Sequence, residues 1–182
     1  MPSVLVPLAQ GCEELEAITL IDLLRRAGMD VTTAGLDAEA VTASRGVRLI
    51  PDTELDAVMN REFDLIVLPG GLPGADHLDR DPRIQKLILE QASADRKVGA
   101  ICAAPKVLAS AGLLDNRAAT AYPGTLESLQ LRGTAITSDR VTVDGNISTS
   151  RGPGTAMDFA LELIEQLAGK AKRDEVEAGL VR

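Results

Sequence analysis

The stretch KVGAICAAP, residues 97–105, predicts a strand that runs directly into a helix, the unit from which the fold is built. Residues 97–101 form a short apolar strand, and residues 103–110 form the helix. A second apolar run, residues 64–68 (DLIVL), ends at Pro69-Gly70-Gly71, and a helix begins later at Asp81-Pro82. A continuous apolar run of this kind is typical of a parallel strand that helices cover on both faces.

The same alternation continues along the chain in both directions. Strands are predicted at residues 4–8, 30–35, 118–121, 140–143 and 146–150, with a hairpin-like excursion at residues 41–49. Helices are predicted at residues 14–27 and 152–167, and the charged tail from Lys170 is expected to form a short exposed helix. These alternating units predict a single α/β domain over residues 1–182, with a doubly wound, mostly parallel sheet and helices on both faces.

Ligands of doubly wound sheets bind outside the carboxyl ends of the strands. Three loops that carry glycine or cysteine lie at such predicted ends, at residues 10–16, 69–74 and 102–105. We therefore expect these three loops to meet in one crevice.

Composition narrows the classes of function. The 182 residues carry a net charge of −8, with one Tyr, two Phe and no Trp. Without a basic block or aromatic platforms, a nucleic-acid surface is not expected. No apolar run is long enough to span a membrane, and no signal peptide is evident. Two cysteines do not make a disulfide framework, so the expected compartment is a reducing cytoplasm.

Cys102 is the first candidate catalytic residue. Its neighbours Gly99, Ala100, Ala103 and Ala104 are small, as a nucleophile elbow between strand and helix requires. Unpaired N–H groups and the positive end of the helix dipole would lower the thiol pKa from about 8.5 towards neutrality. The alternative interpretation is that Cys102 is a small core residue.

Glu16 is the second candidate. With Glu13 and Glu14 it makes the first helical turn acidic, which stabilises a helix N-terminus, and this capping role suffices for Glu13 and Glu14. Glu16 lies one turn further and would point towards the crevice. Beside a thiolate, desolvation and like charge would both raise its pKa. A protonated Glu16 could then donate to the sulfur and later move a proton.

Gly70 and Gly71 follow a buried strand, and their amides could form an oxyanion hole opposite Cys102. A tight turn alone would also explain both glycines. Their spacing does not match a nucleotide-binding glycine pattern, so no nucleotide cofactor is expected.

The single histidine, His77, precedes the elbow, whereas a Cys–His–Glu arrangement needs one after it. We expect His77 to be a solvated helix residue, and with so few His and Cys residues a catalytic metal is not expected. Cys12 should approach the same crevice. It could act as a resolving thiol, although a loop residue tolerated by packing is the favoured interpretation.

Four separated segments together resemble the ThiJ/PfpI superfamily, and within it the protein-deglycase branch. They are VLVPLAQGCEELEA (residues 4–17), LIVLPGGLPGADHL (65–78), AICAAP (100–105) and STSRGPGTAMDFAL (148–161). The resemblance implies a flavodoxin-like fold, a homodimer and a reactive cysteine at the elbow, here Cys102. It further implies that Glu16 is the protonated partner of that cysteine.

The resemblance also implies roles for other positions. Gly71 and Ala103 would offer backbone amides around the sulfur. Arg45 would approach the site from the neighbouring subunit, and Arg151 would lie in the dimer interface. Tyr122, in the segment TAYP, stands where relatives with a third catalytic group carry histidine. A histidine-assisted mechanism is therefore not implied, although a phenol here could orient a substrate carbonyl.

Two functions follow from the resemblance. The favoured one is an enzyme that acts on methylglyoxal, or on its early adducts with amines and thiols, without glutathione, metal or other cofactor. The Cys102 thiolate would attack the aldehyde and Glu16 would shuttle the proton. The alternative is a redox-sensing or chaperone-like stress protein in which Cys102 is oxidised to a sulfinic acid. Both need a reactive thiol, so the identity of the site residues does not separate them.

Overall fold

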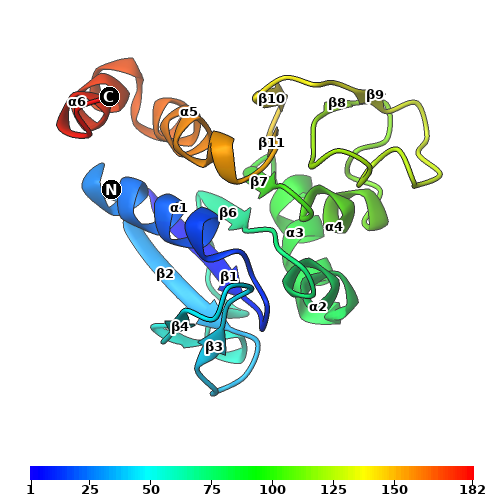
Figure 1. The fold of residues 1–182 in the computed structure, drawn as a ribbon, viewed down its shortest axis with the longest axis horizontal. Coiled ribbons are helices and arrows are strands. Elements are labelled where there is room, and N and C mark those ends of the chain that lie inside the picture. The colour runs from blue at the N-terminus through cyan, green and yellow to red at the C-terminus, as the bar shows by residue number, and fades with distance from the viewer.

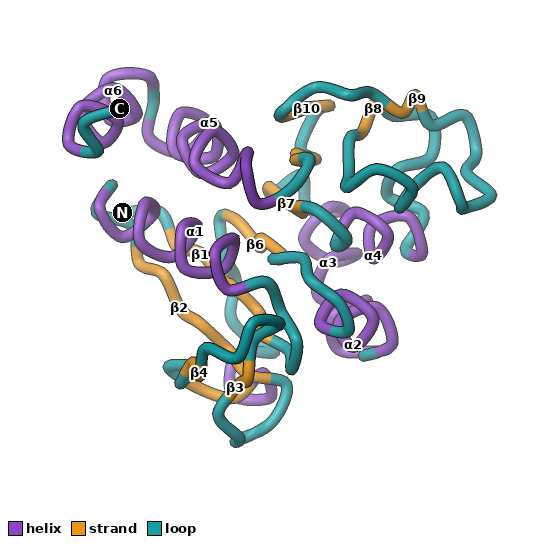
Figure 2. Tube along the Cα trace, viewed as in Figure 1, coloured by secondary structure: helices purple, strands orange, loops and turns teal.

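The computed structural model describes residues 1–182 and places one large sheet between two groups of helices (Figures 1 and 2). The sheet has seven strands in the order β10-β11-β7-β6-β1-β2-β5. All neighbours pair in parallel except β10, which runs antiparallel to β11 at one edge. The predicted doubly wound, mostly parallel α/β fold is therefore confirmed.

The elements have the following bounds. The strands of the large sheet are β1 (Ser3–Leu8), β2 (Asp30–Gly35), β5 (Thr53–Glu54), β6 (Leu65–Leu68), β7 (Lys97–Ile101), β10 (Val141–Asp144) and β11 (Ile147–Ser150). Two small sheets pair β3 (Val41–Thr42) with β4 (Arg48–Leu49), and β8 (Ala118–Ala119) with β9 (Ala135–Ile136). The helices are α1 (Glu14–Arg26), α2 (Gly74–Arg80), α3 (Pro82–Ser93), α4 (Pro105–Ser110), α5 (Ala156–Ala168) and α6 (Lys170–Gly179), with 3-10 turns η1 (Leu55–Val58) and η2 (Pro153–Thr155).

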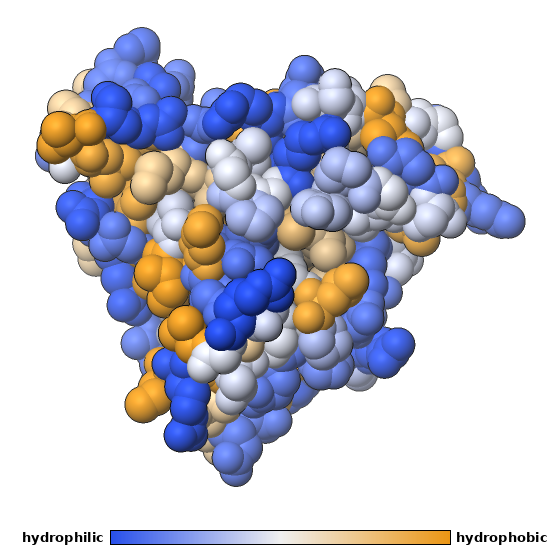
Figure 3. All heavy atoms as spheres, in the orientation of Figure 1, coloured by the Kyte–Doolittle hydropathy of each residue, from blue (hydrophilic) through white to orange (hydrophobic).

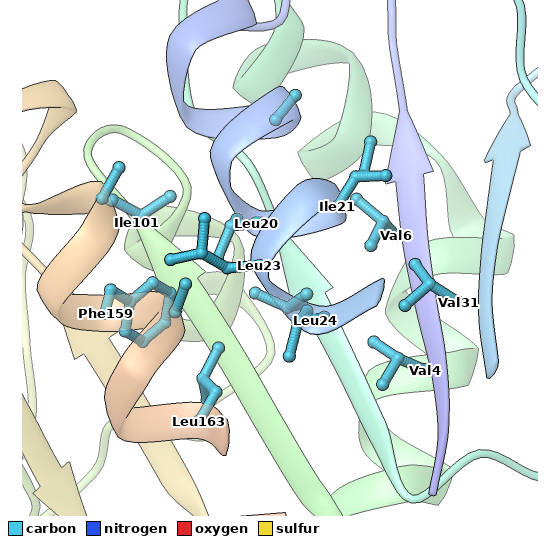
Figure 4. Packing of buried hydrophobic residues seen from close by; sticks show 14 of the residues in the cluster. Val4, Val6, Leu20, Ile21, Leu23, Leu24, Val31, Ile101, Phe159 and Leu163 are labelled. Carbon is cyan, nitrogen blue, oxygen red and sulfur yellow. The ribbon is translucent and has the colours of Figure 1, made fainter. Parts of the chain in front are cut away.

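Successive side chains of the central strands enter two separate cores, because a strand alternates its faces. Val4 and Val6 of β1 pack with α1, α5 and α6, whereas Leu5 packs with the helices of the opposite face. Figure 4 shows Leu23 and Leu24 of α1 and Phe159 of α5 among the residues of the first of these cores. Both faces of the sheet are thus covered, which explains the continuous apolar runs in the sequence.

The order of the strands determines where a ligand site can form. From β1 the chain winds outward through β2 to β5, and then returns to the other side of β1 as β6. The crevice of a doubly wound sheet opens where this direction reverses, at the carboxyl ends of the strands. The loops that follow β1 and β6 flank this point, and β7, which ends at the elbow, is the next strand along.

Several elements differ from their predicted form. The strand expected at residues 118–121 is reduced to β8 and pairs with β9 outside the large sheet. The tail forms α6 as expected, but Val176 is buried against the α1–α5 core, so this helix is only partly exposed. The excursion at residues 41–49 is the antiparallel β3–β4 hairpin. The sequence patterns placed His77 in a helix without giving bounds for α2, and they did not reveal β5 or η1. No helix is both long and apolar enough to cross a membrane.

Candidate active site

Cys102 occupies a sharp turn between β7 and α4. Its φ angle is +64°, a left-handed conformation that is uncommon for a residue with a side chain. Two hydrogen bonds hold this backbone: the Cys102 N–H donates to the Ser150 carbonyl at 2.9 Å, and the Tyr122 N–H donates to the Cys102 carbonyl at 2.8 Å. Strain of this kind persists only where the surroundings enforce it, and it gathers at functional sites. The predicted elbow geometry is confirmed.

Glu16 is completely buried beside this turn. The helix that carries it is capped by Glu13, whose Oε2 accepts a hydrogen bond from the Glu16 N–H at 2.8 Å. The Glu16 Oε2 accepts a hydrogen bond from the Gly70 N–H at 2.9 Å. Its Oε1 is the one buried side-chain oxygen or nitrogen without a partner. An orphaned polar atom of this kind calls for an explanation, and the neighbouring thiol offers one.

Gly70 allows the carboxyl group and the thiol to come together. A Cβ at this position would lie 2.6 Å from the Cβ of Cys102 and 2.8 Å from the Oε2 of Glu16. Both groups therefore lie close to the Cα of Gly70, and any side chain at this position would push the Glu16 carboxyl and Cys102 apart. The expected use of the Gly70 amide as an oxyanion donor is wrong, because that N–H already donates to Glu16.

The backbone N–H groups of Gly71 and Ala103 lie near the Cys102 sulfur and act to lower its pKa. Gly71 has a φ angle of +86°, and a Cβ there would lie 2.4 Å from the Glu13 nitrogen. Glycine is thus needed for this turn to bring its amide to the sulfur. Two N–H groups from different loops surround one sulfur, an arrangement that stabilises negative charge on it or on an oxygen bonded next to it.

Burial raises the pKa of the Glu16 carboxyl from 4.5 to about 7. Hydrogen bonds from Cys102 and Gly70 lower this pKa, and the charge of Glu13 raises it slightly. Burial also raises the pKa of the Cys102 thiol from 9.0 to about 12, with a further increase from the Glu16 carboxylate. The predicted lowering of the thiol pKa is therefore wrong for this pair. Helix α4 begins only at Pro105, and burial beside a carboxylate outweighs the amides of Gly71 and Ala103.

The two groups titrate as a coupled pair and hold one proton between them across the intervening pH range. When that proton is on Glu16, the sulfur is a thiolate that the two amides stabilise. This form of the pair has the nucleophile and the proton donor side by side.

The raised pKa of Glu16 predicts that the protein loses stability as pH rises from about 4.5 to 7. The folded state holds this proton more tightly than the unfolded state, so ionisation of Glu16 opposes folding. The shift from 4.5 to about 7 corresponds to a loss on the order of 3 kcal/mol in the free energy of unfolding. Urea unfolding across this range should show the loss in the wild type but not in Glu16→Gln, which does not titrate. Parallel curves for the two proteins would contradict the assignment.

Glu14 has a role that the sequence interpretation missed. It is buried, and its carboxylate accepts hydrogen bonds from the Ser44 hydroxyl at 3.0 Å and from the Arg45 N–H at 2.8 Å. These bonds hold its pKa below the usual value despite the opposing cost of burial. Instead of capping α1, Glu14 fastens the tip of the β3–β4 hairpin to the site. No local pattern signals this, because the partners lie about thirty residues away along the chain.

The remaining candidates lie around the elbow or beyond it. Tyr122 is half exposed, and its backbone N–H donates a hydrogen bond to the Cys102 carbonyl. Arg151 is half-buried in the loop after β11. Arg45 is exposed at the hairpin tip, and its guanidinium contacts only the Ser44 carbonyl of its own chain at 3.3 Å. Its expected approach to a neighbouring subunit remains a prediction.

Cys12 and His77 are not part of the Cys102–Glu16 pair. Cys12 is completely buried, and burial with the nearby Glu14 charge raises its thiol pKa to about 12, which favours the packing interpretation. His77 lies in α2 as expected and is half-buried, with its Nδ1 3.1 Å from the Gln10 carbonyl oxygen. No group of three or more His, Cys, Asp or Glu side chains is placed to hold a metal ion.

Comparison with known proteins identifies relatives of this chain. Residues 2–166 match the DJ-1/PfpI family. Protein dj-1beta of Drosophila melanogaster is 46% identical over 98% of this chain and 96% of its own length. The crystal structure of that protein superposes with a TM-score of 0.94 and covers 99% of this chain and 97% of that one. The glutathione-independent glyoxalase DJR-1.2 of Caenorhabditis elegans is 36% identical over 92% of this chain and 89% of its own length. An oxidized DJ-1 of Toxoplasma gondii is 38% identical with a TM-score of 0.94, covering 100% of this chain and 98% of that one.

Proposed function

Because the chain belongs to the DJ-1/PfpI family, we propose that it is a cysteine-dependent enzyme that acts on methylglyoxal or its early adducts without glutathione. One observation carries the proposal: the unpartnered Oε1 of the fully buried Glu16 beside the elbow that bears Cys102. A buried carboxyl oxygen without a hydrogen-bond partner destabilises the fold. Proton transfer next to a nucleophile, however, requires a carboxyl oxygen that is free to give and take the proton. The glyoxalase of C. elegans supports the substrate class.

In the proposed reaction, the Cys102 thiolate attacks the aldehyde carbon of methylglyoxal and forms a C–S bond. The amides of Gly71 and Ala103 stabilise the resulting oxyanion, which takes the proton of Glu16 and becomes a hemithioacetal. The Glu16 carboxylate then removes the proton from the former aldehyde carbon and returns it to the adjacent carbon, while the hydroxyl proton passes from the oxygen of the first carbon to the oxygen of the second. This converts the hemithioacetal into a lactoyl thioester. Water cleaves the thioester to release lactate and restores the thiol.

A homodimer belongs to the same proposal. Leu15 and Ile18, on the outer side of α1, are 51% and 45% exposed, and Val47 of the hairpin is 47% exposed. Figure 3 shows hydrophobic side chains gathered over α1 on this face of the molecule. A second copy of the chain would cover them. Sedimentation should then give twice the 19.2 kDa mass of one chain.

A redox-sensing role is the second candidate. Oxidation of Cys102 to a sulfinic acid would place its oxygens between the Glu16 carboxyl and the amides of Gly71 and Ala103, so the same groups would stabilise it. The oxidized T. gondii relative favours keeping this alternative. Here an oxidant such as peroxide supplies the two oxygen atoms, and turnover of dicarbonyls is incidental.

The deciding experiment uses freshly reduced protein, methylglyoxal and no glutathione. The expected result is lactate formed in an amount equal to the methylglyoxal consumed. Consumption without lactate would mean only that exposed side chains become glycated. No lactate from fully reduced protein would overturn the enzyme proposal and leave the redox role.

A further inference from the structure

A shallow depression lies between the two loops that hydrogen-bond to the backbone of Cys102. It has a volume of about 230 Å³, and its lining residues are Tyr122, Pro123, Arg151, Gly152, Pro153, Gly154 and Thr155. The two segments that line this depression are each connected to Cys102 by a backbone hydrogen bond. The Tyr122 N–H donates to the Cys102 carbonyl, and the Cys102 N–H donates to Ser150, which immediately precedes Arg151.

Arg151 differs from the other half-buried arginines of the chain. The others are Arg83, Arg96, Arg117 and Arg173, and each of them forms an ion pair with an aspartate or a glutamate. The Arg151 side chain has neither a hydrogen bond nor an ion pair, in a protein whose acidic residues outnumber its basic ones by 27 to 19. A guanidinium with part of its hydration removed and no counter-charge is ready to bind an anion.

Tyr122 supplies the apolar part of the same depression. Its ring lies against Gly152, where a Cβ would come 3.4 Å from the ring carbon Cδ2. The ring is nevertheless 53% exposed, so one part of it remains free. The depression therefore offers an aromatic surface and a cationic group within one small space. That space is smaller than the roughly 300–1,000 Å³ of sites for drug-sized ligands.

We propose that this depression, the Tyr122–Arg151 subsite, binds a carboxylate on the substrate of Cys102. The guanidinium of Arg151 pairs with the two carboxylate oxygens, and Tyr122 contacts the carbon chain that joins the carboxylate to the reacting carbonyl group. The inference rests on the proposed function and adds to its substrate class the carbonyl compounds and adducts that carry a carboxylate, which the subsite should favour over uncharged ones. It also gives Arg151 a role other than the interface role that the family resemblance implies.

The kinetic test compares two substrates that differ only in charge. They are the methylglyoxal hemithioacetals of N-acetylcysteine and of N-acetylcysteine amide. Arg151→Gln should raise KM for the carboxylate substrate by about tenfold and leave KM for the amide unchanged, because it removes one charged hydrogen-bonded pair. Arg151→Lys should recover part of the difference. Arg132→Gln removes the same charge from an exposed site outside the lining and should change neither value.

A second test does not depend on turnover. Iodoacetate and iodoacetamide alkylate the same thiol, but only the first carries a carboxylate. In Arg151→Gln the ratio of the two alkylation rates at Cys102 should fall several-fold, and in Arg132→Gln it should stay as in the wild type. An unchanged ratio in Arg151→Gln would overturn the subsite, even if the enzyme proposal itself holds. So would equal loss of both rates together with dissociation of a dimer, which would identify Arg151 as an interface residue.

Discussion

Cys102→Ala is expected to lower the rate of lactate formation from methylglyoxal by about four orders of magnitude or more, the scale on which loss of a catalytic nucleophile acts. No other side chain can take over the attack. The second thiol, Cys12, is completely buried, and it has no counterpart of the Glu16 carboxyl that accepts the proton of Cys102. The measurement is lactate produced by equal amounts of reduced wild type and variant.

The matched control for this variant is Cys12→Ser, which removes the other free thiol. It should retain lactate formation, although replacing a buried sulfur by a hydroxyl costs some stability. Alanine keeps the Cβ of Cys102, which packs against Gly70, so Cys102→Ala should stay folded. Urea unfolding of the variant checks this. Substantial turnover by folded Cys102→Ala would exclude a covalent mechanism. Loss of activity in Cys12→Ser alone would transfer the nucleophile to Cys12.

Much of the fold was predictable because its signals are local. The strands β1, β6 and β7 are largely apolar runs of four to six residues, and β2, which holds two threonines, was predicted with the bounds that the structure shows. The elbow was predictable for the same reason. Small residues on both sides of Cys102 reflect a steric requirement that the neighbouring sequence must satisfy by itself.

Features that depend on distant partners were not predictable. The Gly70 amide looked free for an oxyanion, but Glu16, 54 residues earlier, already accepts its hydrogen bond. The short β8 resembled a strand of the large sheet, yet the Thr120 N–H that follows it donates to the Thr149 side chain instead of extending a ladder. The thiol pKa was misjudged because a local helix effect was weighed without knowing how deeply Cys102 and Glu16 are buried together.

Glu16→Gln should change turnover and thiol reactivity in opposite directions. Turnover should fall by about a hundredfold to ten-thousandfold, because an amide can neither give nor take the proton that moves between the two carbons of the substrate. The reactivity of Cys102 should rise. The Glu16 carboxylate is one of the causes that raise the thiol pKa to about 12, and removing its charge lowers that pKa and increases the thiolate fraction near neutral pH. Lactate formation and iodoacetamide alkylation, measured on the same samples across pH, give the two readouts.

The opposite signs distinguish a proton shuttle from a residue that only supports the fold. If Glu16 merely held the loop of Gly70 in place, its replacement would disturb Cys102 and lower both rates together. Glu16→Asp is the conservative control. It keeps the acid, so it should retain more turnover than Glu16→Gln, while its carboxylate should leave the alkylation rate close to that of the wild type. Parallel loss of both rates in Glu16→Gln would remove Glu16 from the chemistry and leave the Cys102 elbow without its proposed acid.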